Sequence, residues 1–412
     1  MSVAQRRSEV DATIGQLHWL PIDSPSNGSE TRIRKTAERL TDFGEVYSIH
    51  PCESQTMLTD NLHSIPVSNP LLRNKRTRID LWYATLCGGP SNPYHRFQTE
   101  VTKRAIRQTG LTFDLLVSEG PQTTTAALEL ASEHGAPVLI NKHNAMYVLL
   151  DQLLEDYIVP ERLKQRAVRA LQELEQSAIN RADAVVFQSD ADREAFTLPE
   201  DTEIATIPNG TDYEMIRTGG NPHELQRAYG LPSEGPFIVF VGSFEYAPNR
   251  AVANLMLREF APACPDAEFL LVGRDPPSAA GQPNVHALGF VDDLPGVLQL
   301  ADIAICPLQQ GRGTKLKMMD YLAAGLPIVT TSVGAEGIDV VDGENVRICD
   351  DMNAFVAEIQ LLVDDPQARA YLATQAATVG KRYAWSNVLE AYAPIVNRLL
   401  GRSEQPPQPI PE

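Results

Sequence analysis

Short runs of aliphatic and β-branched residues alternate with amphipathic helical patterns along most of the chain. In the first half, FDLLVS, APVLIN and DAVVFQS have the pattern of buried strands, and a helix over about 160–180 separates the last two. In the second half, FIVFVGS, AEFLLVG and ADIAICPL repeat this pattern. Because strands that alternate with helices are typical of parallel sheets with crossover helices, the periodicity predicts two doubly wound α/β domains.

The remaining elements follow from the same periodicities. Further strands are expected at IGQLHWLPI, EVYSIH, TEIATIPNG, NVHALGF, LPIVTTS and NVRIC, and further helices near 29–42, 248–263, 314–324, 351–364, 366–380 and 385–400. Residues 52–95 show no clear pattern, and the Pro-rich end over 401–412 is expected to be a disordered tail.

A linker that contains Gly and Pro, RTGGNPHELQRAYGLPSEGP, separates the two halves. We therefore expect a first domain over 1–218 and a second over 219–381. The carboxyl ends of parallel strands bind ligands in doubly wound sheets, so these ends are expected to face a shared cleft.

The composition is that of an ordinary globular protein, with 43% hydrophobic and 21% charged residues and a net charge of −18. The acidic total argues against nucleic-acid binding. The sequence shows no signal peptide and no apolar run long enough to span a membrane. Its five cysteines have no paired spacing, which predicts reduced thiols and a cytoplasmic protein.

The first quarter of the chain is comparatively basic, because residues 1–110 hold slightly more basic than acidic side chains. These basic side chains form either a solvated face or a surface for anionic lipid headgroups or an anionic acceptor, which would place the protein at the inner face of a membrane. Two groups carry most of the charge: Arg32, Arg34, Lys35 and Arg39 in the first expected helix, and Arg73, Lys75, Arg76 and Arg78 further on.

The stretch GRGTKLKMMDYLAAGLPIVTTSVGAEG, residues 311–337, has the composition of a phosphate-binding segment. It lacks the spacing of an NTP-cleaving P-loop and the third glycine of a dinucleotide-binding loop. A helix N-terminus beside flexible backbone and lysine can still bind a diphosphate, because its free N–H groups and dipole attract anions. Thr314 is expected to cap this helix, and Lys315 or Lys317 to neutralise charge. The alternative is an ordinary capped surface helix.

The second half carries several motifs in a fixed order: VFVGSFEYAPNR, FLLVGR, VHALGFVDDLPGVLQLADIAICPL, the stretch above, and RYAW. This set resembles the nucleotide-sugar domain of GT-B glycosyltransferases of the family 4 group. The first half resembles the partner domain through PIDSPSNGSETRIRKTAERL, INKHNAMY and RADAVVFQSDADREAF. The resemblance implies two Rossmann-like domains facing a central cleft, and a last helix, 382–400, that crosses back to the first domain.

The resemblance also implies a set of donor-binding residues. Asp320 matches the second acid of the family's E-x7-E motif, which holds the ribose hydroxyls, whereas Arg312 stands where the first acid is usual. The backbone of Leu316 and Lys317, after Gly313, matches the segment that meets the donor phosphates. Lys315 is our candidate for a charge near them, because the loop 243–250 lacks the family's lysine.

Other candidates for donor contacts have structural alternatives. Gly242 and Ser243 end a strand, where a tight turn would explain them equally well. Arg274 lies near a strand's carboxyl end, where it contacts the donor or forms an ion pair within its loop. Glu336 either begins a helix or contacts the donor. Gly28 matches the family's phosphate-facing glycine, although a loop glycine needs no ligand.

His143 follows the strand APVLIN and resembles the family's histidine that approaches the donor sugar. An imidazole there could hydrogen-bond the sugar and stabilise developing charge, or it could belong to a structural network at the strand end. Asn144 is expected to cap the following helix, and Asn209 with Gly210 to form a turn.

The implied function is a glycosyltransferase that moves a sugar from a nucleoside-diphosphate donor to a glycan, lipid-linked or small-molecule acceptor, with retention of configuration. The sequence shows no metal-ligand spacing and implies no cofactor and no obligatory metal. Two alternatives remain open: a non-catalytic partner or scaffold protein, which Arg312 and the lysine-free loop would fit, and a nucleotide-sugar epimerase. A nicotinamide oxidoreductase is disfavoured, since no dinucleotide fingerprint is present.

Overall fold

The computed structural model describes residues 12–25, 28–52, 54–67, 93–155, 159–279, 281–311 and 313–402. The chain divides into two compact units, Met1–Ile207 with Leu389–Glu412, and Pro208–Val388. The first unit ends before the position that the sequence predicted, since the segment that follows Ile207 belongs to the second unit. The predicted tail over 401–412 lies almost wholly outside the described residues.

The first unit contains a sheet of eight strands in the order β3-β4-β2-β1-β5-β6-β7-β8. All neighbouring strands are parallel except β3 and β4. The strands are β1 (Ala12–Leu17), β2 (Gly44–His50), β3 (Met57–Thr59), β4 (Leu62–Pro66), β5 (Leu115–Ser118), β6 (Val138–Lys142), β7 (Ala184–Phe187) and β8 (Glu203–Thr206). The chain proceeds outward from β1 in one direction and from β5 in the other, so the strand order reverses between these two neighbours.

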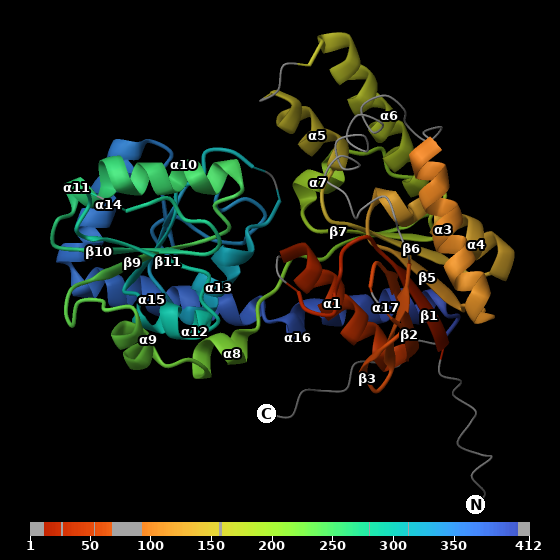
Figure 1. Cartoon of the computed structure of the whole chain (residues 1–412), viewed down its shortest axis with the longest axis horizontal. Helices are drawn as coiled ribbons and strands as arrows, with labels where there is room; N and C mark the ends of the chain where they lie inside the picture. The colour runs from red at the N-terminus through yellow and green to blue at the C-terminus, as the bar shows by residue number, and fades with distance from the viewer. Residues whose placement is uncertain are drawn as a thin grey trace, which may run out of the picture. The chain divides into compact units, whose positions relative to one another are not determined.

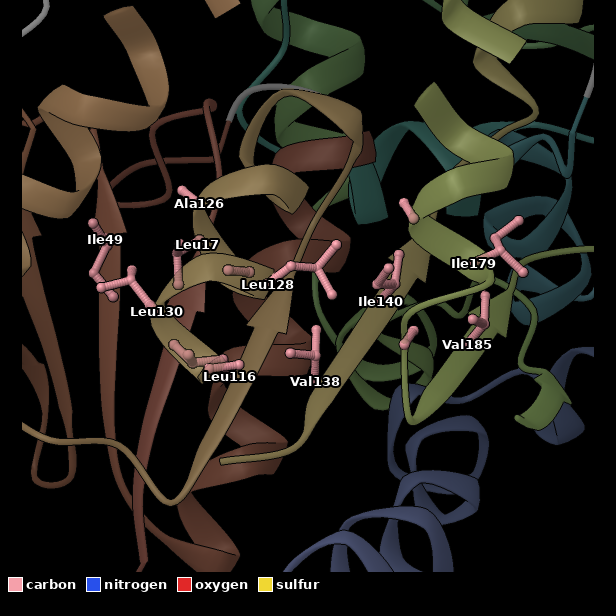
Figure 2. Packing of buried hydrophobic residues seen from close by; sticks show 14 of the residues in the cluster. Leu17, Ile49, Leu116, Ala126, Leu128, Leu130, Val138, Ile140, Ile179 and Val185 are labelled. Carbon is pink, nitrogen blue, oxygen red and sulfur yellow. The ribbon is translucent and has the colours of Figure 1, made fainter. Parts of the chain in front are cut away.

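Helices cover both faces of this sheet (Figure 1). They are α1 (Gly28–Leu40), α3 (Pro93–Thr109), α4 (Pro121–His134), α5 (Met146–Glu155), α6 (Glu161–Ile179), α7 (Asp190–Glu194) and α17 (Tyr392–Leu399). One face packs on α3, α4 and α6, where Leu116, Leu130, Ile140 and Ile179 belong to one buried cluster (Figure 2). Successive residues of a strand point to opposite faces of the sheet. Strands made of consecutive apolar residues therefore bury side chains against the helices on both faces.

The second unit contains a six-stranded parallel sheet in the order β11-β10-β9-β12-β13-β14. Its strands are β9 (Phe237–Val241), β10 (Glu268–Val272), β11 (Val285–Gly289), β12 (Ile303–Cys306), β13 (Ile328–Thr330) and β14 (Arg347–Ile348). The strand order reverses between β9 and β12. In open α/β sheets such a reversal opens a crevice at the carboxyl ends, where ligands bind.

The helices of the second unit lie on the two faces of its sheet, with α10 over one face and α9 and α12 over the other (Figure 1). They are α8 (Tyr213–Thr218), α9 (Pro222–Ala228), α10 (Ala247–Leu255), α11 (Ala261–Ala263), α12 (Leu294–Leu300), α13 (Leu316–Ala324), α14 (Met352–Asp364), α15 (Pro366–Arg382) and α16 (Trp385–Val388). A π-helical turn, Met256–Phe260, joins α10 to α11, so the predicted helix over 248–263 is interrupted.

Three sequence-based expectations need correction. The expected linker contains the helix α9, capped by Asn221, whose side chain accepts a hydrogen bond from the Glu224 amide. The expected helix over 385–400 is divided into α16, a 3-10 turn and α17. Arg32 does not lie on a solvated basic face: its side chain is buried and donates to the Ile207 carbonyl at 2.7 Å.

The other basic residues of α1 also make contacts within the fold. Arg34 pairs with Glu38 at 2.7 Å, and Arg39 pairs with Glu390 at 2.9 Å. The second basic group, 73–78, lies outside the described residues. Over the ranges given above, no helix combines the length and apolarity needed to cross a membrane. The four described cysteines are free thiols.

The packing of α15 on α13 generates the first prediction. Gly380 is buried in α15, and a Cβ built on it would lie 2.4 Å from the Leu322 carbonyl carbon and oxygen. Gly380→Ala is therefore expected to destabilise the protein by about 1–3 kcal/mol, because overpacking outweighs the better helix propensity of alanine. Urea unfolding measures this free energy. Thr378→Ala, at an exposed position of α15, is the control, and a Gly380→Ala protein as stable as wild type would contradict the close packing.

Candidate functional site

Two loops meet at the reversal of the second sheet. One follows β9 and begins at Gly242, and the other follows β12 and leads through Gly311 and Gly313 into α13. Gly311 and Gly313 both have positive φ, 118° and 77°, which favours glycine at these turns. This places the Gly-rich stretch, identified from sequence as a phosphate-binding candidate, at the edge where doubly wound sheets bind ligands. Arg312 lies outside the described residues.

The start of α13 differs from the expectation in one respect. The helix begins at Leu316, and the residue before it, Lys315, makes no side-chain cap. Thr314 therefore does not cap the helix. Instead, it is buried, and its hydroxyl accepts a hydrogen bond from Asn209 Nδ2 at 2.6 Å. The first amides of a helix have no partner within it, so the amides at the start of α13 are donors that an anion can use.

Lys315 and Glu336 contact each other. Lys315 Nζ donates to the Gly313 carbonyl at 2.6 Å and lies 3.3 Å from Glu336 Oε2. Glu336 belongs to a turn and no helix starts there, so the interpretation of this acid as a helix start is wrong. Because its charge is already paired, Lys315 is a weaker candidate for phosphate neutralisation than the sequence indicated.

Lys317 is a partly buried cation without a carboxylate partner among the described residues. Its ammonium donates to Asn249 Oδ1 at 2.9 Å and lies 3.9 Å from the centroid of the Phe240 ring. A Cβ on Gly242 would stand 2.6 Å from Asn249 Nδ2 and 2.8 Å from this nitrogen, so a larger residue at the end of β9 would displace both side chains. Burial, followed by the nearby Lys315, lowers the pKa of Lys317 to about 8. An amide oxygen and an aromatic ring compensate only part of the cost of a buried charge.

Asp320 lies one turn further along α13. Its Oδ1 accepts a hydrogen bond from the Thr211 hydroxyl at 2.7 Å, and it forms no ion pair within the described ranges. Burial raises the pKa of Asp320 to about 7, which the Thr211 hydrogen bond opposes and the nearby Asp212 reinforces. One side of α13 therefore holds a partly buried acid and a base, three residues apart, that are not paired with each other.

The remaining donor candidates lie around the same loops, with different contacts. The Ser243 carbonyl accepts from Asn249 Nδ2 at 2.8 Å, which fixes the loop after β9. The Arg274 carbonyl accepts from the Phe244 amide at 2.9 Å, and its guanidinium lies 5.6 Å from the centroid of the Phe290 ring. The alternative of an ion pair for Arg274 is not observed among the described residues.

In the first unit, His143 follows β6 and is held from both sides. Its Nε2 lies 2.9 Å from Glu119 Oε2, and its Nδ1 lies 2.8 Å from Gln188 Nε2. An amide NH₂ can only donate, so Nδ1 accepts and Nε2 carries the proton donated to Glu119. This arrangement fixes the ring plane and the tautomer of His143.

Glu119 is the centre of a larger buried network. Its other oxygen, Oε1, accepts from Gln16 Nε2 and from Asn141 Nδ2, both at 2.8 Å. Asn141 Oδ1 in turn accepts from the Tyr392 hydroxyl of α17 at 2.9 Å. Glu119, Gln188 and Asn249 were not predicted from the sequence. Glu119 and Gln188 had a usable signal, since each directly follows a buried strand, LLVS and AVVF.

Two further expectations concern loops of the first unit. Gly28 is the first residue of α1, so it lies at the start of the helix that the sequence predicted after it. Residues 26–27, which precede it, lie outside the described residues. The expected cap by Asn144 is not observed among the described residues: the amides of Met146 and Tyr147 at the start of α5 donate to Glu175, at 3.2 and 2.9 Å.

Comparison with known proteins identifies the family. Residues 27–210 match the family described as "Glycosyl transferase 4-like domain", and residues 235–365 match "Glycosyl transferases group 1". The chain belongs to the family 4-like glycosyltransferases. The two matches cover most of the chain and fall on different halves, as the sequence motifs predicted.

Curated relatives of this glycosyltransferase family member are distant. D-inositol 3-phosphate glycosyltransferase of Corynebacterium diphtheriae is 26% identical over 42% of this chain and 45% of its own length. Phosphatidyl-myo-inositol mannosyltransferase of Mycobacterium leprae is 28% identical over 43% of this chain and 51% of its own length. The chain thus spans about half the length of the curated relatives it matches.

Solved structures match the chain over nearly its whole length. Sucrose-phosphate synthase from Thermosynechococcus elongatus has a TM-score of 0.72 at 16% identity, covering 95% of this chain and 99% of that one. Anabaena HepE in complex with UDP-glucose has a TM-score of 0.65 at 15% identity, covering 94% and 100%. These similarities confirm the predicted GT-B fold, built of two Rossmann-like α/β units.

The raised pKa of Asp320 predicts a stability change with pH. Between its ordinary value of 3.8 and about 7, the folded state keeps a proton that the unfolded chain releases, so stability falls as pH rises through this window. Asp320→Asn removes that loss and is expected to melt at a higher temperature than wild type at pH 8, with the difference vanishing near pH 4. Thermal unfolding across this range tests it, and an unchanged difference at all pH values would contradict it.

Proposed function

We propose that this protein transfers a sugar from a nucleoside-diphosphate donor to a hydroxyl acceptor. In this reaction the bond between the anomeric carbon and the diphosphate oxygen breaks and its electron pair stays on the diphosphate. The acceptor oxygen forms the new glycosidic bond and its proton is released. Membership of a glycosyltransferase family supports the reaction class, and the structural neighbour HepE has been solved in complex with UDP and with UDP-glucose.

One observation carries the donor-binding proposal: Lys317 is a partly buried ammonium at the sheet reversal with no carboxylate beside it among the described residues. A diphosphate would supply the missing negative charge, and the helix N-terminus of α13 would supply backbone donors. Asp320, when ionised, would accept hydrogen bonds from the two vicinal ribose hydroxyls, which needs the acceptor oxygens that a carboxylate offers. Lys317 thus takes the role that the sequence analysis gave to Lys315.

We propose His143 as the residue that interacts with the transferred sugar. Its tautomer is fixed by Gln188 and Glu119, and the Glu119 carboxylate can stabilise positive charge that develops on the ring. Retention of configuration is proposed from the family resemblance, and analysis of the anomeric configuration of the product tests it. The acceptor remains any glycan, lipid-linked or small-molecule hydroxyl compound.

Removal of the Lys317 charge tests the donor site. Lys317→Met is expected to weaken binding of UDP, GDP or ADP by roughly 10–100-fold, because a charge-assisted hydrogen bond contributes about 1.5–3 kcal/mol. The nucleosides alone should lose little affinity. Titration calorimetry measures both. Lys381→Met, at an exposed lysine of α15, is the control and should bind as wild type does.

The pH dependence of donor binding sharpens this test. Affinity should increase as pH rises through about 7, where Asp320 ionises, and decrease above about 8, where Lys317 loses its proton. Lys317→Met should abolish the decrease in affinity above about pH 8, and Asp320→Asn should abolish the increase through about pH 7. If no nucleoside diphosphate raised the melting temperature of the wild-type protein at pH 7.5, donor binding as proposed would be wrong.

Replacement of Glu119 tests the role of His143. Glu119→Gln keeps the shape but removes the carboxylate, so kcat is expected to fall by about 10²-fold while nucleoside-diphosphate affinity stays unchanged. Initial rates with a donor identified by the binding screen provide the measurement. Glu133→Gln, on the surface of α4, is the control. An equal loss of donor affinity would instead indicate a structural role for Glu119.

A further inference from the structure

Three metal-ligating residue types meet at the carboxyl edge of the first sheet. Asp23 lies in the loop after β1, His50 is the last residue of β2, and Cys52 follows two residues later. Since β1 and β2 are parallel neighbours, their carboxyl ends lie side by side. One ligand atom from each of the three residues lies within 4.8 Å of the other two. Spacing along the chain does not reveal this group, because Asp23 comes from a different loop.

The distances fit a small divalent ion. His50 Nε2 lies 3.7 Å from Asp23 Oδ1. Zinc bonds of about 2.0–2.3 Å in tetrahedral geometry place neighbouring ligand atoms roughly 3.4–3.8 Å apart. The histidine and the carboxylate already have this separation, and the Cys52 thiol can close the remaining gap by rotation of its side chain, which now donates to the Ser54 carbonyl at 3.5 Å.

His50 is the feature that distinguishes this group from an ordinary polar cluster. Its ring is fully buried, and its Nδ1 has no hydrogen-bond partner among the residues that the structure describes. The neighbouring His18 provides a contrast, since its ring stacks on His50 at 4.7 Å and both of its nitrogens are satisfied, by Leu20 and Ser48. Nε2 is the ring nitrogen that faces Asp23, so its lone pair is the one that a metal ion would take, with the ring proton on Nδ1.

Ser64 connects the two proposed ligand side chains. Its Oγ lies 3.1 Å from His50 Nε2 and donates to Asp23 Oδ1 at 3.1 Å. The hydroxyl holds the imidazole and the carboxylate close together, and it would give up its contact with Nε2 when an ion binds that nitrogen. Asp23 is exposed and Cys52 is half-buried, so an ion can reach the group from solvent.

We propose that Asp23, His50 and Cys52 form a binding site for a thiolate- and imidazole-preferring divalent ion of the zinc class. Three protein ligands leave a fourth position for water or for an oxygen of a bound molecule. The thiol releases its proton to solvent when the metal–sulfur bond forms, and no oxidation or reduction is involved. The ion connects the loop after β1 to the end of β2, and its binding stabilises the first unit.

Cobalt(II) substitution tests this site without recourse to transferase activity. Full-length protein, freed of metal by a chelator and then dialysed, is titrated with cobalt. We expect a sulfur-to-cobalt charge-transfer band that saturates at about one ion per chain, and a melting temperature that rises with added zinc. No saturable band, or no zinc-dependent rise in melting temperature, overturns the proposal.

The variants identify the ligands. Cys52→Ser should abolish the band, whereas Cys349→Ser, which removes another half-buried thiol, should leave it intact. Asp23→Asn, at an exposed position that does not endanger folding, should weaken cobalt binding by about 10-fold or more. A band that survives in Cys52→Ser, disappears in Cys349→Ser, or keeps its affinity in Asp23→Asn contradicts the assignment.

Discussion

Parallel pairing of strands is the constraint on which the functional layout of this protein depends. In each sheet the strands run in the same direction, apart from β3. The carboxyl ends of the parallel strands therefore lie at one edge of the sheet, and the crossover helices lead the chain back to the opposite edge. The loops with candidate functional residues therefore lie together at this edge, although they are far apart in the sequence. In the second sheet the reversal between β9 and β12 adds a crevice, and the Gly-rich loop before α13 lies beside it.

The pairing of charges then determines which residues near those loops are available to bind a ligand. Lys315 and Glu336 pair with each other, whereas Lys317 and Asp320 lie partly buried on α13 and are not paired with each other. Their pKa values move towards neutrality, to about 8 and about 7, because burial disfavours both charged forms. Unpaired buried charges reduce stability, and they are typical of sites that a ligand of complementary charge completes.

The first unit differs from the second, because the carboxylate of Glu119 has hydrogen-bond partners at both of its oxygens. Glu119 accepts from Gln16 and Asn141 and contacts His143, and Asn141 also accepts from Tyr392. Through this network a residue of the last helix supports a histidine that follows β6. A change in α17 can therefore affect the orientation of His143 although the two are far apart in sequence.

The sequence by itself determined the fold class, the family and nearly every strand, because buried parallel strands are continuous apolar runs whose signal is local. It also located the stretch proposed to bind phosphate, the acid Asp320 and His143, since each follows a recognisable strand or motif. Only the tertiary structure showed that Lys317 and not Lys315 lacks a counter-charge among the described residues, that Arg32 is buried, that Glu119 contacts His143, and that Asp23 lies near His50 and Cys52. Burial, pairing of charges and contacts between loops depend on how separate segments pack, and local periodicity contains no information about them.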